Sequence, residues 1–134
     1  LTVISYGDTL AKINFRHLIQ NHRKSKCVLT IVAAPIQNPF GLVNWNYKSK
    51  ATNFEEKPIL NHYIGYAVIS PNFFRKLNKK IINLKDGKGI IQAIKNLISK
   101  KQVNIYKFNK LQITINSPEE LKYARLNYKK YFTL

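Results

Sequence analysis

Several kinds of residue are scarce in this chain of 134 residues. It has one cysteine, Cys27, so neither an internal disulfide nor a metal site built from several cysteines can form. No apolar run reaches the ~18 residues that a membrane-spanning helix needs, and the first residues lack the basic and then apolar order of a signal peptide. We therefore expect a soluble chain in a reducing compartment, the cytoplasm.

Acidic residues are also rare, since 6 Asp and Glu stand against 23 Lys and Arg and the formal net charge is +17. Disorder is not expected, because 45% of the residues are hydrophobic and disorder requires low hydrophobicity together with high charge. The length suits one core, so residues 1–134 are expected to form a single domain.

The positive charge raises the question of a nucleic-acid partner, because Lys and Arg clusters bind phosphate chains by releasing counterions. The densest basic segments, residues 22–26, 75–80 and 129–130, are scattered along the chain. No zinc-finger or RNA-recognition signature accompanies them, and the aromatic residues lie in apolar segments. A solvated basic face is therefore preferred, and a nucleic-acid-binding domain is kept as an alternative.

Apolar patterns predict an α/β chain. Continuous apolar runs at residues 1–6, 27–34 and 63–70 are typical of buried strands, and a helix capped by Asn14 is expected over residues 14–24. A strand, helix, strand order is the unit of a parallel sheet. We expect further strands at residues 40–46, 51–55, 103–108 and 111–115, and further helices at 71–77, 90–100 and 117–131. Ser70 is the expected cap of the helix at 71–77, and Ser117, followed by Pro118 and two acidic residues, is the expected start of the last helix. The expected fold is Rossmann-like α/β, a mixed and mainly parallel sheet flanked by helices.

The few acidic residues mark candidate sites. Asp8, Glu55 and Glu56 lie at a strand end or at a junction of strand and loop, which is where open α/β sheets bind ligands. Asp8 alone would suffice to bind Mg²⁺ at the edge of a nucleotide pocket, because Mg²⁺ is usually held by one or two carboxylates together with substrate phosphates. The alternative for a lone Asp is a capping or turn role.

Glu56-Lys57-Pro58 combines a carboxylate, an ammonium group and a rigid turn. The pair suits a phosphorylated polyol, because Lys can bind phosphate and Glu can accept hydrogen bonds from hydroxyls; a surface ion pair is the alternative. Residues 86–89 lack a full phosphate-loop framework and are interpreted as an ordinary loop. The His residues show neither zinc-site spacing nor a nucleophile elbow.

Seven short segments carry a family resemblance through their order and spacing: residues 3–10, 22–23, 29–32, 39–43, 54–58, 63–71 and 115–121. They include Gly7-Asp8, Glu56-Lys57-Pro58 and Ser117-Pro118-Glu119-Glu120. Together they resemble the sugar-phosphate nucleotidylyltransferases, which join a nucleoside triphosphate to a sugar 1-phosphate. The resemblance implies a partial nucleotidyltransferase fold, with residues 1–134 as the carboxyl-terminal part of the domain.

The resemblance also implies roles for matched positions. Asp8 would hold the Mg²⁺ bound to the nucleotide phosphates, and Asp8 and Lys57 would be the catalytic residues. The sugar phosphate would attack the nucleotide α-phosphate and pyrophosphate would leave, so catalysis would rest on positioning and charge neutralisation. The implied substrate-binding residues are Gly7, Gly41, Glu56, Lys57 and Gly65.

Two departures from the family pattern are visible. Family members begin with a Gly-rich G-G-x-G-T-R-L loop that holds the triphosphate, and these residues contain no such segment. Thr114 stands where the family has the metal-binding Asp of Trp-x-Asp, so a hydroxyl would be the second metal ligand. We expect a fragment, a split half that needs a complementing chain, or a degenerate homologue.

Two alternatives to a transferase stay open. Thr114 favours a non-catalytic regulatory or assembly module of the same fold, and charge alone favours a nucleic-acid-binding domain. For the enzyme, the expected partners are a nucleoside triphosphate and a sugar 1-phosphate, with no membrane. The base, the sugar and the oligomeric state, a homo-oligomer included, leave no recognisable pattern.

Overall fold

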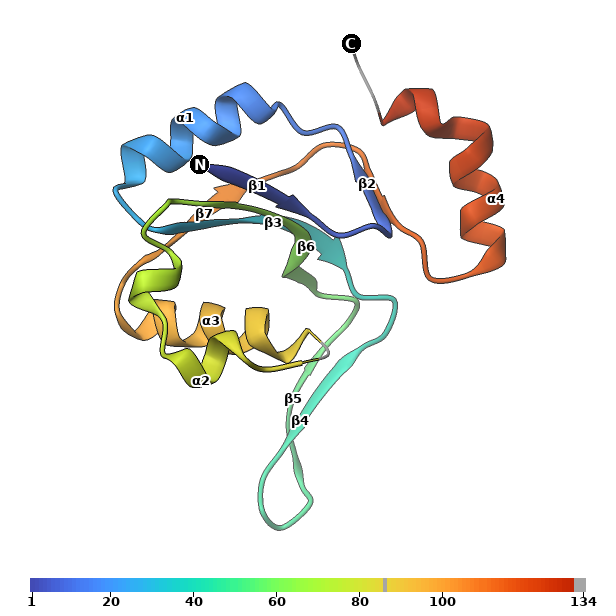
Figure 1. Ribbon diagram of the computed structural model, residues 1–134. Coiled ribbons are helices and arrows are strands. Elements are labelled where there is room, and N and C mark those ends of the chain that lie inside the picture. The colour runs from blue at the N-terminus through green and yellow to red at the C-terminus, as the bar shows by residue number, and fades with distance from the viewer. Residues whose placement is uncertain (86, 132–134) are drawn as a thin grey trace.

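A computed structural model describes residues 1–85 and 87–131; Asp86, the first residue of the loop expected at 86–89, lies outside the described residues. A four-stranded sheet forms the centre, with helices on both faces (Figure 1). Its strands, in spatial order, are β1 (Thr2–Ser5), β6 (Ile59–Ile69), β3 (Leu29–Gln37) and β7 (Val103–Lys107).

The other elements surround this sheet. The helices are α1 (Phe15–Ser25), α2 (Lys79–Ile82), α3 (Lys88–Ser99) and α4 (Pro118–Asn127), with the short 3₁₀ helices η1 (Phe74–Lys76) and η2 (Tyr128–Lys130). Two strand pairs lie outside the sheet: β2 (Thr9–Ala11) with β8 (Gln112–Thr114), and β4 (Leu42–Trp45) with β5 (Ala51–Glu55). Among the described residues, no helix combines the length and the apolar character needed to cross a membrane.

The predicted fold class is confirmed: the sheet is mixed and helices flank it. β6 pairs antiparallel with both β1 and β3, and β3 pairs parallel with β7, so β1, β3 and β7 share one direction. The position of β6 was not predicted. It lies between the two strands of the expected strand, helix, strand unit, so β1 and β3 run parallel without being neighbours.

Two apolar clusters fix the helices on the sheet. On one face, Leu18 of α1 packs with Val32 and Val68. On the other face, Leu97 of α3 packs with Leu29. Alternate side chains of β3 therefore enter opposite clusters, which explains why this strand is a continuous apolar run in the sequence.

Local signals set two helix starts as predicted. Asn14 caps α1, where its side chain accepts a hydrogen bond of 2.9 Å from the amide of His17. Ser117 and Glu120 form a reciprocal capping box at the start of α4. The predicted helix at residues 71–77 is wrong, because that region holds a turn and η1, and α2 begins only at Lys79. Ser70, its expected cap, instead places its hydroxyl 2.8 Å from His22 Nε2.

The prediction of a buried first strand is also wrong. β1 forms the edge of the sheet and pairs on one side only, and three of its four residues are exposed. Val3 remains 38% exposed although it is apolar. An apolar run therefore predicted the strand correctly but not its burial.

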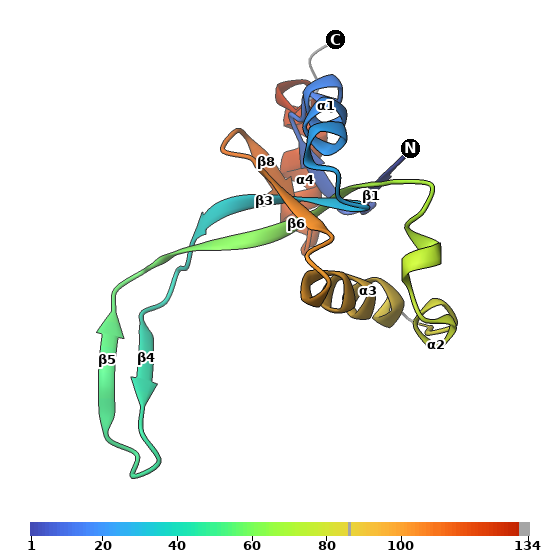
Figure 2. The ribbon, with the colours of Figure 1, turned by 90° about the vertical axis from the view of Figure 1, so that its left-hand side faces the viewer.

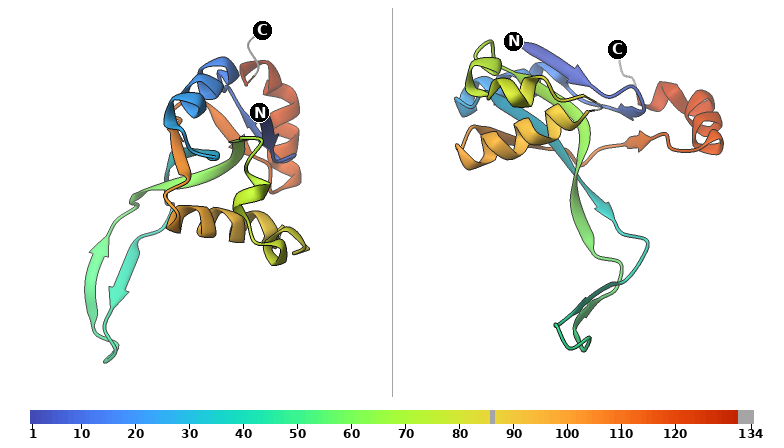
Figure 3. Two further views of the ribbon diagram at one scale, coloured as in Figure 1. Left: turned by 60° about the vertical axis from the view of Figure 1, so that its left-hand side comes forward. Right: turned by 60° about the horizontal axis from the view of Figure 1, so that its bottom comes forward.

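The β4–β5 hairpin projects from the sheet as an extension of β3 and β6 (Figure 2). The further views in Figure 3 show the same projection, with α1 and α3 remaining on the body of the molecule. Every residue of β5 is exposed. The hairpin therefore has no apolar cover from the described residues.

Candidate functional site

The candidate residues lie along one end of the sheet. Because β1, β3 and β7 share a direction, their carboxyl ends point the same way, and the antiparallel β6 begins at that end. Gly7-Asp8 follows β1, and Glu56-Lys57 precedes β6. Open α/β sheets bind ligands at the carboxyl ends of their strands.

Asp8 and Thr114 lie close together although they are far apart in the sequence. The hydroxyl of Thr9 donates to Asp8 Oδ1 over 3.2 Å and lies 3.2 Å from Thr114 Oγ1. β2 and β8 hold this arrangement, because Thr9 pairs with Thr114 across the two strands. The amide of Ile115 also donates to the Asp8 carbonyl oxygen over 2.7 Å. The structure thus brings Asp8 and Thr114 into one cluster, while their role as metal ligands stays a prediction.

Thr9 and Tyr66 support Asp8, and sequence reasoning missed both. Thr9 is only 4% exposed, and its carbonyl oxygen accepts a hydrogen bond of 2.7 Å from the Tyr66 hydroxyl. Burial raises the pKa of Tyr66, so this hydroxyl stays protonated and donating over a wide pH range. Nothing in the sequence marks the pair, since Tyr66 lies within an apolar run and Thr9 resembles a turn residue.

Gly65 shapes the turn that carries Gly7 and Asp8. Its φ is +81°, and a Cβ at this position would lie 2.8 Å from the ring of Tyr6. The amide of Tyr6 donates to the Gly65 carbonyl oxygen over 3.0 Å, so the two backbones are in register. The space that Gly65 leaves open is thus filled by Tyr6, and a contact of Gly65 with sugar stays a prediction.

A second group of candidates gathers at the base of the hairpin. A Cβ on Gly41 would lie 2.9 Å from the Phe54 ring and 3.3 Å from Glu56 Oε2, so Gly41 is adjacent to both residues. Lys57 Nζ lies 3.9 Å from Glu56 Oε1, and the two side chains are 55% and 64% exposed respectively. Lys57 takes a φ of 45°, which directs the chain sharply into β6. The pair is accessible to a ligand and is also compatible with a surface ion pair.

The structure keeps these two groups apart. Tyr6 pairs with Gly65, whereas Lys57 precedes Ile59 at the start of the strand. Since a strand rises ~3.4 Å per residue, the stretch of β6 from Ile59 to Gly65 separates the groups by about 20 Å. Asp8 with Thr114, and Gly41 with Glu56 and Lys57, are therefore two distinct clusters.

The cluster at Asp8 offers oxygen ligands only. Among the described residues, no three His, Cys, Asp or Glu side chains come together as a metal-binding group. Asp8 is exposed, and the Thr9 hydroxyl lies 3.2 Å from both Asp8 Oδ1 and Thr114 Oγ1, so the cluster contains one carboxylate and the Thr114 hydroxyl. This set fits Mg²⁺, which takes few protein carboxylates and completes its shell with water and substrate phosphates.

A separate cavity of about 720 Å³ opens on the α3 face of the sheet, beside β3, β6 and β7. Tyr63, Lys107 and Asn109 are among its lining residues, and none of the candidate site residues lines it. Burial is the main cause that raises the pKa of Tyr63, and the nearby Tyr6 adds to it. The cavity is therefore distinct from both clusters.

Comparisons with known proteins agree with the fold and the residue pattern. A family model described as nucleotidyl transferase matches residues 1–114. Among solved structures, the chain is similar to a putative glucose-1-phosphate thymidylyltransferase from Bacillus anthracis, solved in complex with a sucrose, with a TM-score of 0.65 and 16% sequence identity. The match covers 98% of this chain and 55% of that one, so this chain spans about half the length of that protein. At this identity the likeness shows the fold.

Proposed function

The chain belongs to the nucleotidyl transferase family, and we propose that it forms the sugar-phosphate side of a sugar-1-phosphate nucleotidylyltransferase. The proposed reaction transfers a nucleoside monophosphate from a nucleoside triphosphate to a sugar 1-phosphate. The observation that carries this proposal is the extent of the family match, which contains all the candidate site residues from Gly7 to Thr114.

The cluster at the hairpin base binds the acceptor. Lys57 contributes a positive charge for the sugar phosphate, and Glu56 accepts hydrogen bonds from sugar hydroxyls. Gly41 lies beside Glu56 and would bring its backbone close to the sugar, although the Phe54 ring already fills the space that a Cβ on Gly41 would occupy. The exposure of the Glu56 and Lys57 side chains supports this assignment, since both are free to meet a ligand.

The cluster at Asp8 binds the nucleotide phosphates through Mg²⁺. Asp8 and the Thr114 hydroxyl would hold the ion, which when bound supplies positive charge to the phosphates during transfer. Thr9 keeps Asp8 in place through the hydrogen bond to Oδ1, and Gly65, with its positive φ, leaves room for the Tyr6 ring just before Gly7 and the carboxylate. The hydroxyl at position 114 adds no negative charge, so this site binds the ion more weakly than one with two carboxylates.

The bond changes follow from this placement. An oxygen of the sugar phosphate attacks the α-phosphorus, and the bond from that phosphorus to the bridging oxygen breaks. Pyrophosphate leaves with the bonding electron pair, and no covalent intermediate with the protein is needed. For Lys57 and Asp8 to act on the same phosphates, the β4–β5 hairpin must move toward Asp8, and the irregular pairing between Ile31 and Ala33 offers a place to bend.

The nucleotide side of the site requires a Gly-rich segment, from a longer chain or from a complementing one. The half-length match to the solved transferase supports this requirement. We further propose that residues 1–134 act as one unit of the domain. Its location would be the cytoplasm, where nucleoside triphosphates are available.

A second candidate function is a non-catalytic module of the same fold. Thr114 favours it, because the residue next to Asp8 across β2 and β8 carries no charge. Such a module would still bind sugar phosphates or nucleotides without joining them. For this module we expect binding of a sugar phosphate or a nucleotide without release of pyrophosphate.

Pyrophosphate release separates the two functions. The chain is assayed with Mg²⁺, the common nucleoside triphosphates and a panel of sugar 1-phosphates, both alone and joined to or mixed with a segment that contains the G-G-x-G-T-R-L loop. The transferase predicts release in the complemented assay, loss of release in Asp8→Asn and Lys57→Ala, and unchanged release in the control Lys50→Ala. If no combination released pyrophosphate, the transferase function would be rejected and the non-catalytic module would remain.

A further inference from the structure

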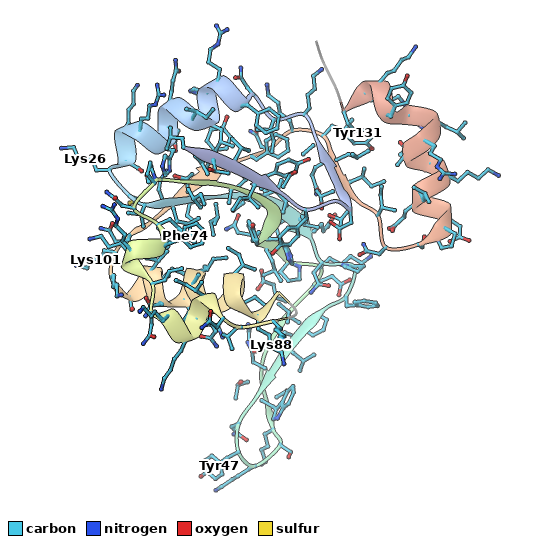
Figure 4. All side chains as sticks on the ribbon, viewed as in Figure 1. Lys26, Tyr47, Phe74, Lys88, Lys101 and Tyr131 are labelled. Carbon is cyan, nitrogen blue, oxygen red and sulfur yellow. The ribbon has the colours of Figure 1, made fainter. Side chains whose placement is uncertain are left out.

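Three basic segments from distant parts of the sequence meet at the end of the sheet opposite the candidate site. We call this surface the cationic end; its residues are Arg23, Lys24, Lys26, Arg75, Lys76, Lys100 and Lys101. Lys100 Nζ donates to the Lys76 carbonyl oxygen over 2.8 Å, and Cys27 Sγ lies 4.0 Å from the Lys101 carbonyl oxygen. Figure 4 shows Lys26, Lys101 and Phe74 on the same side of the molecule. The basic segments that are scattered in the sequence are therefore gathered by the fold.

No described acidic residue belongs to this end. Asp8 lies at the carboxyl end of the sheet, Glu55 and Glu56 at the hairpin, and Glu119 and Glu120 at the start of α4. In residues 1–85 and 87–131, the one ion pair joins Lys57 to Glu56. The positive charges of the cationic end are thus not neutralised by carboxylates of the described chain.

Two of these lysines occupy positions where glycine is usual. Lys26 follows α1 with a φ of 58°, and Lys101 follows the end of α3 with a φ of 55°. Left-handed residues after a helix are most often Gly, because a Cβ is disfavoured there. Both cations therefore stand where the backbone conformation is unfavourable for a residue with a Cβ.

An exposed aromatic ring lies among the same basic residues. Phe74 is 56% exposed and directly precedes Arg75 and Lys76. Its ring packs edge-on against Phe73, with centroids 5.1 Å apart, and Phe73 is buried. A fixed aromatic ring beside cations is the arrangement on which nucleic-acid bases stack while lysines and arginines bind the phosphates.

We propose that the cationic end binds single-stranded nucleic acid. The lysines and arginines bind successive phosphates, and a base stacks on Phe74. An anionic membrane is the less favoured partner, because lipid headgroups offer no flat ring to stack on Phe74. The surface lies at the opposite end of the sheet from Asp8, so the binding is independent of the proposed nucleotidyl transfer.

A charge-removing variant that does not weaken the fold tests this proposal. Lys26→Gly combined with Lys101→Gly removes two cations and relieves both positive φ angles, so its Tm is expected to equal or exceed that of the unmodified chain. Binding is measured by fluorescence anisotropy with labelled 20-nucleotide oligothymidylate and oligouridylate over a salt series. We expect Kd to rise about tenfold near 0.1 M salt, and the magnitude of the slope of log K against log salt to fall by about 1.4, since each phosphate contact on a single strand contributes about 0.7.

A matched control removes the same charge elsewhere. Lys129→Gln combined with Lys130→Gln changes η2, next to Tyr131, which Figure 4 places on the opposite side from Lys26. This variant is expected to keep Kd within about twofold. Phe74→Ser is expected to raise Kd about fivefold or more, because a stacking surface is lost.

Three results would overturn the proposal. The first is no binding of either oligonucleotide at low salt. The second is an equal loss of affinity in the two charge variants, which would mean diffuse attraction without a defined surface. The third is tighter binding to vesicles of phosphatidylcholine and phosphatidylserine than to oligonucleotides, with no effect of Phe74→Ser. None of these results depends on pyrophosphate release, so the proposal of nucleic-acid binding and the proposal of nucleotidyl transfer can be rejected independently.

Discussion

The hydroxyl oxygens of Thr9 and Thr114 lie 3.2 Å apart across the short β2–β8 pair. This contact joins β2, near the start of the chain, to β8, which precedes α4. Because Thr9 also donates to Asp8, the contact fixes the position of the one carboxylate in this cluster. The geometry of the proposed metal site therefore depends on the contact between Thr9 and Thr114.

Restoring a carboxylate at position 114 tests that site. Thr114→Asp places a second negative charge beside Asp8, so affinity for Mg²⁺ or Mn²⁺ is expected to rise about tenfold, since ligand charge tunes divalent-ion binding. Mn²⁺-dependent relaxation of water protons measures this affinity. Thr114→Asn is the uncharged control. Equal affinity in both variants would mean that position 114 does not face the ion.

Removal of the Thr9 hydroxyl tests the support of Asp8. Thr9→Val keeps the shape but leaves Thr114 Oγ1 and Asp8 Oδ1 without this partner, so the free energy of unfolding is expected to fall by about 1–2 kcal/mol. Thr9→Ser retains the hydroxyl and should lose less. Urea unfolding measures both variants. A Val variant as stable as the Ser variant would contradict the role of this hydrogen bond.

Substitution of Gly65 and of Gly7 by alanine is expected to change the free energy of unfolding by different amounts. Gly65→Ala is expected to cost about 2 kcal/mol or more, because the residue has a positive φ and the new methyl group would meet the Tyr6 ring. Gly7→Ala is expected to cost less than about 1 kcal/mol, since nothing lies within 4 Å of the point that its Cβ would occupy. Thermal unfolding distinguishes them. Similar losses in the two variants would exclude the clash as the cause.

The buried His22 is expected to make the free energy of unfolding depend on pH. Burial, with the positive amino terminus as a second cause, lowers the pKa of His22 below its usual 6.5. The unfolded chain therefore binds a proton near pH 6.5 that the folded chain does not, so stability is full above that pH and decreases as the pH falls toward the folded pKa. Unfolding midpoints between pH 7.5 and 5 measure the decrease.

A variant at position 22 is the control for this dependence. His22→Gln keeps polar groups near Thr30 and Ser70, each of which lies 2.8 Å from a ring nitrogen of His22, and it cannot titrate. The decrease between pH 6.5 and 5 is expected to be smaller in this variant, whereas the exposed His62→Gln should retain it. The same decrease in His22→Gln would assign the effect to other groups.

The sequence predicted what local chemistry determines. The cap at Asn14 and the box of Ser117 with Glu120 depend on residues three positions apart, and both were correct. The apolar runs at residues 27–34 and 63–70 correctly predicted β3 and β6, because a strand with clusters on both faces is apolar throughout. The family resemblance assigned Asp8 and Thr114 to one metal site; the Thr9 hydroxyl links the two residues, and their ligand role stays a prediction.

The remaining features depend on contacts between distant segments. The insertion of β6 decides which strand becomes an edge, and no pattern within residues 1–6 records that. Ser70 looked like a helix cap, but His22 engages its hydroxyl from another element. Thr9 and Tyr66 carry no local signal, and the cationic end exists only once α1, η1 and α3 have packed. The distance between the clusters at Asp8 and Lys57 is likewise a property of the long β6.

Binding of a sugar 1-phosphate to this chain is the most direct test of the central claim. Acceptor binding does not require the segment that binds the nucleotide. Saturation-transfer NMR with a panel of sugar 1-phosphates can therefore be applied to residues 1–134 alone. The account predicts transfer to at least one sugar 1-phosphate, its loss in Lys57→Ala, and its retention in Lys50→Ala on the same hairpin. No transfer to any member of the panel, or equal transfer in Lys57→Ala, would contradict it.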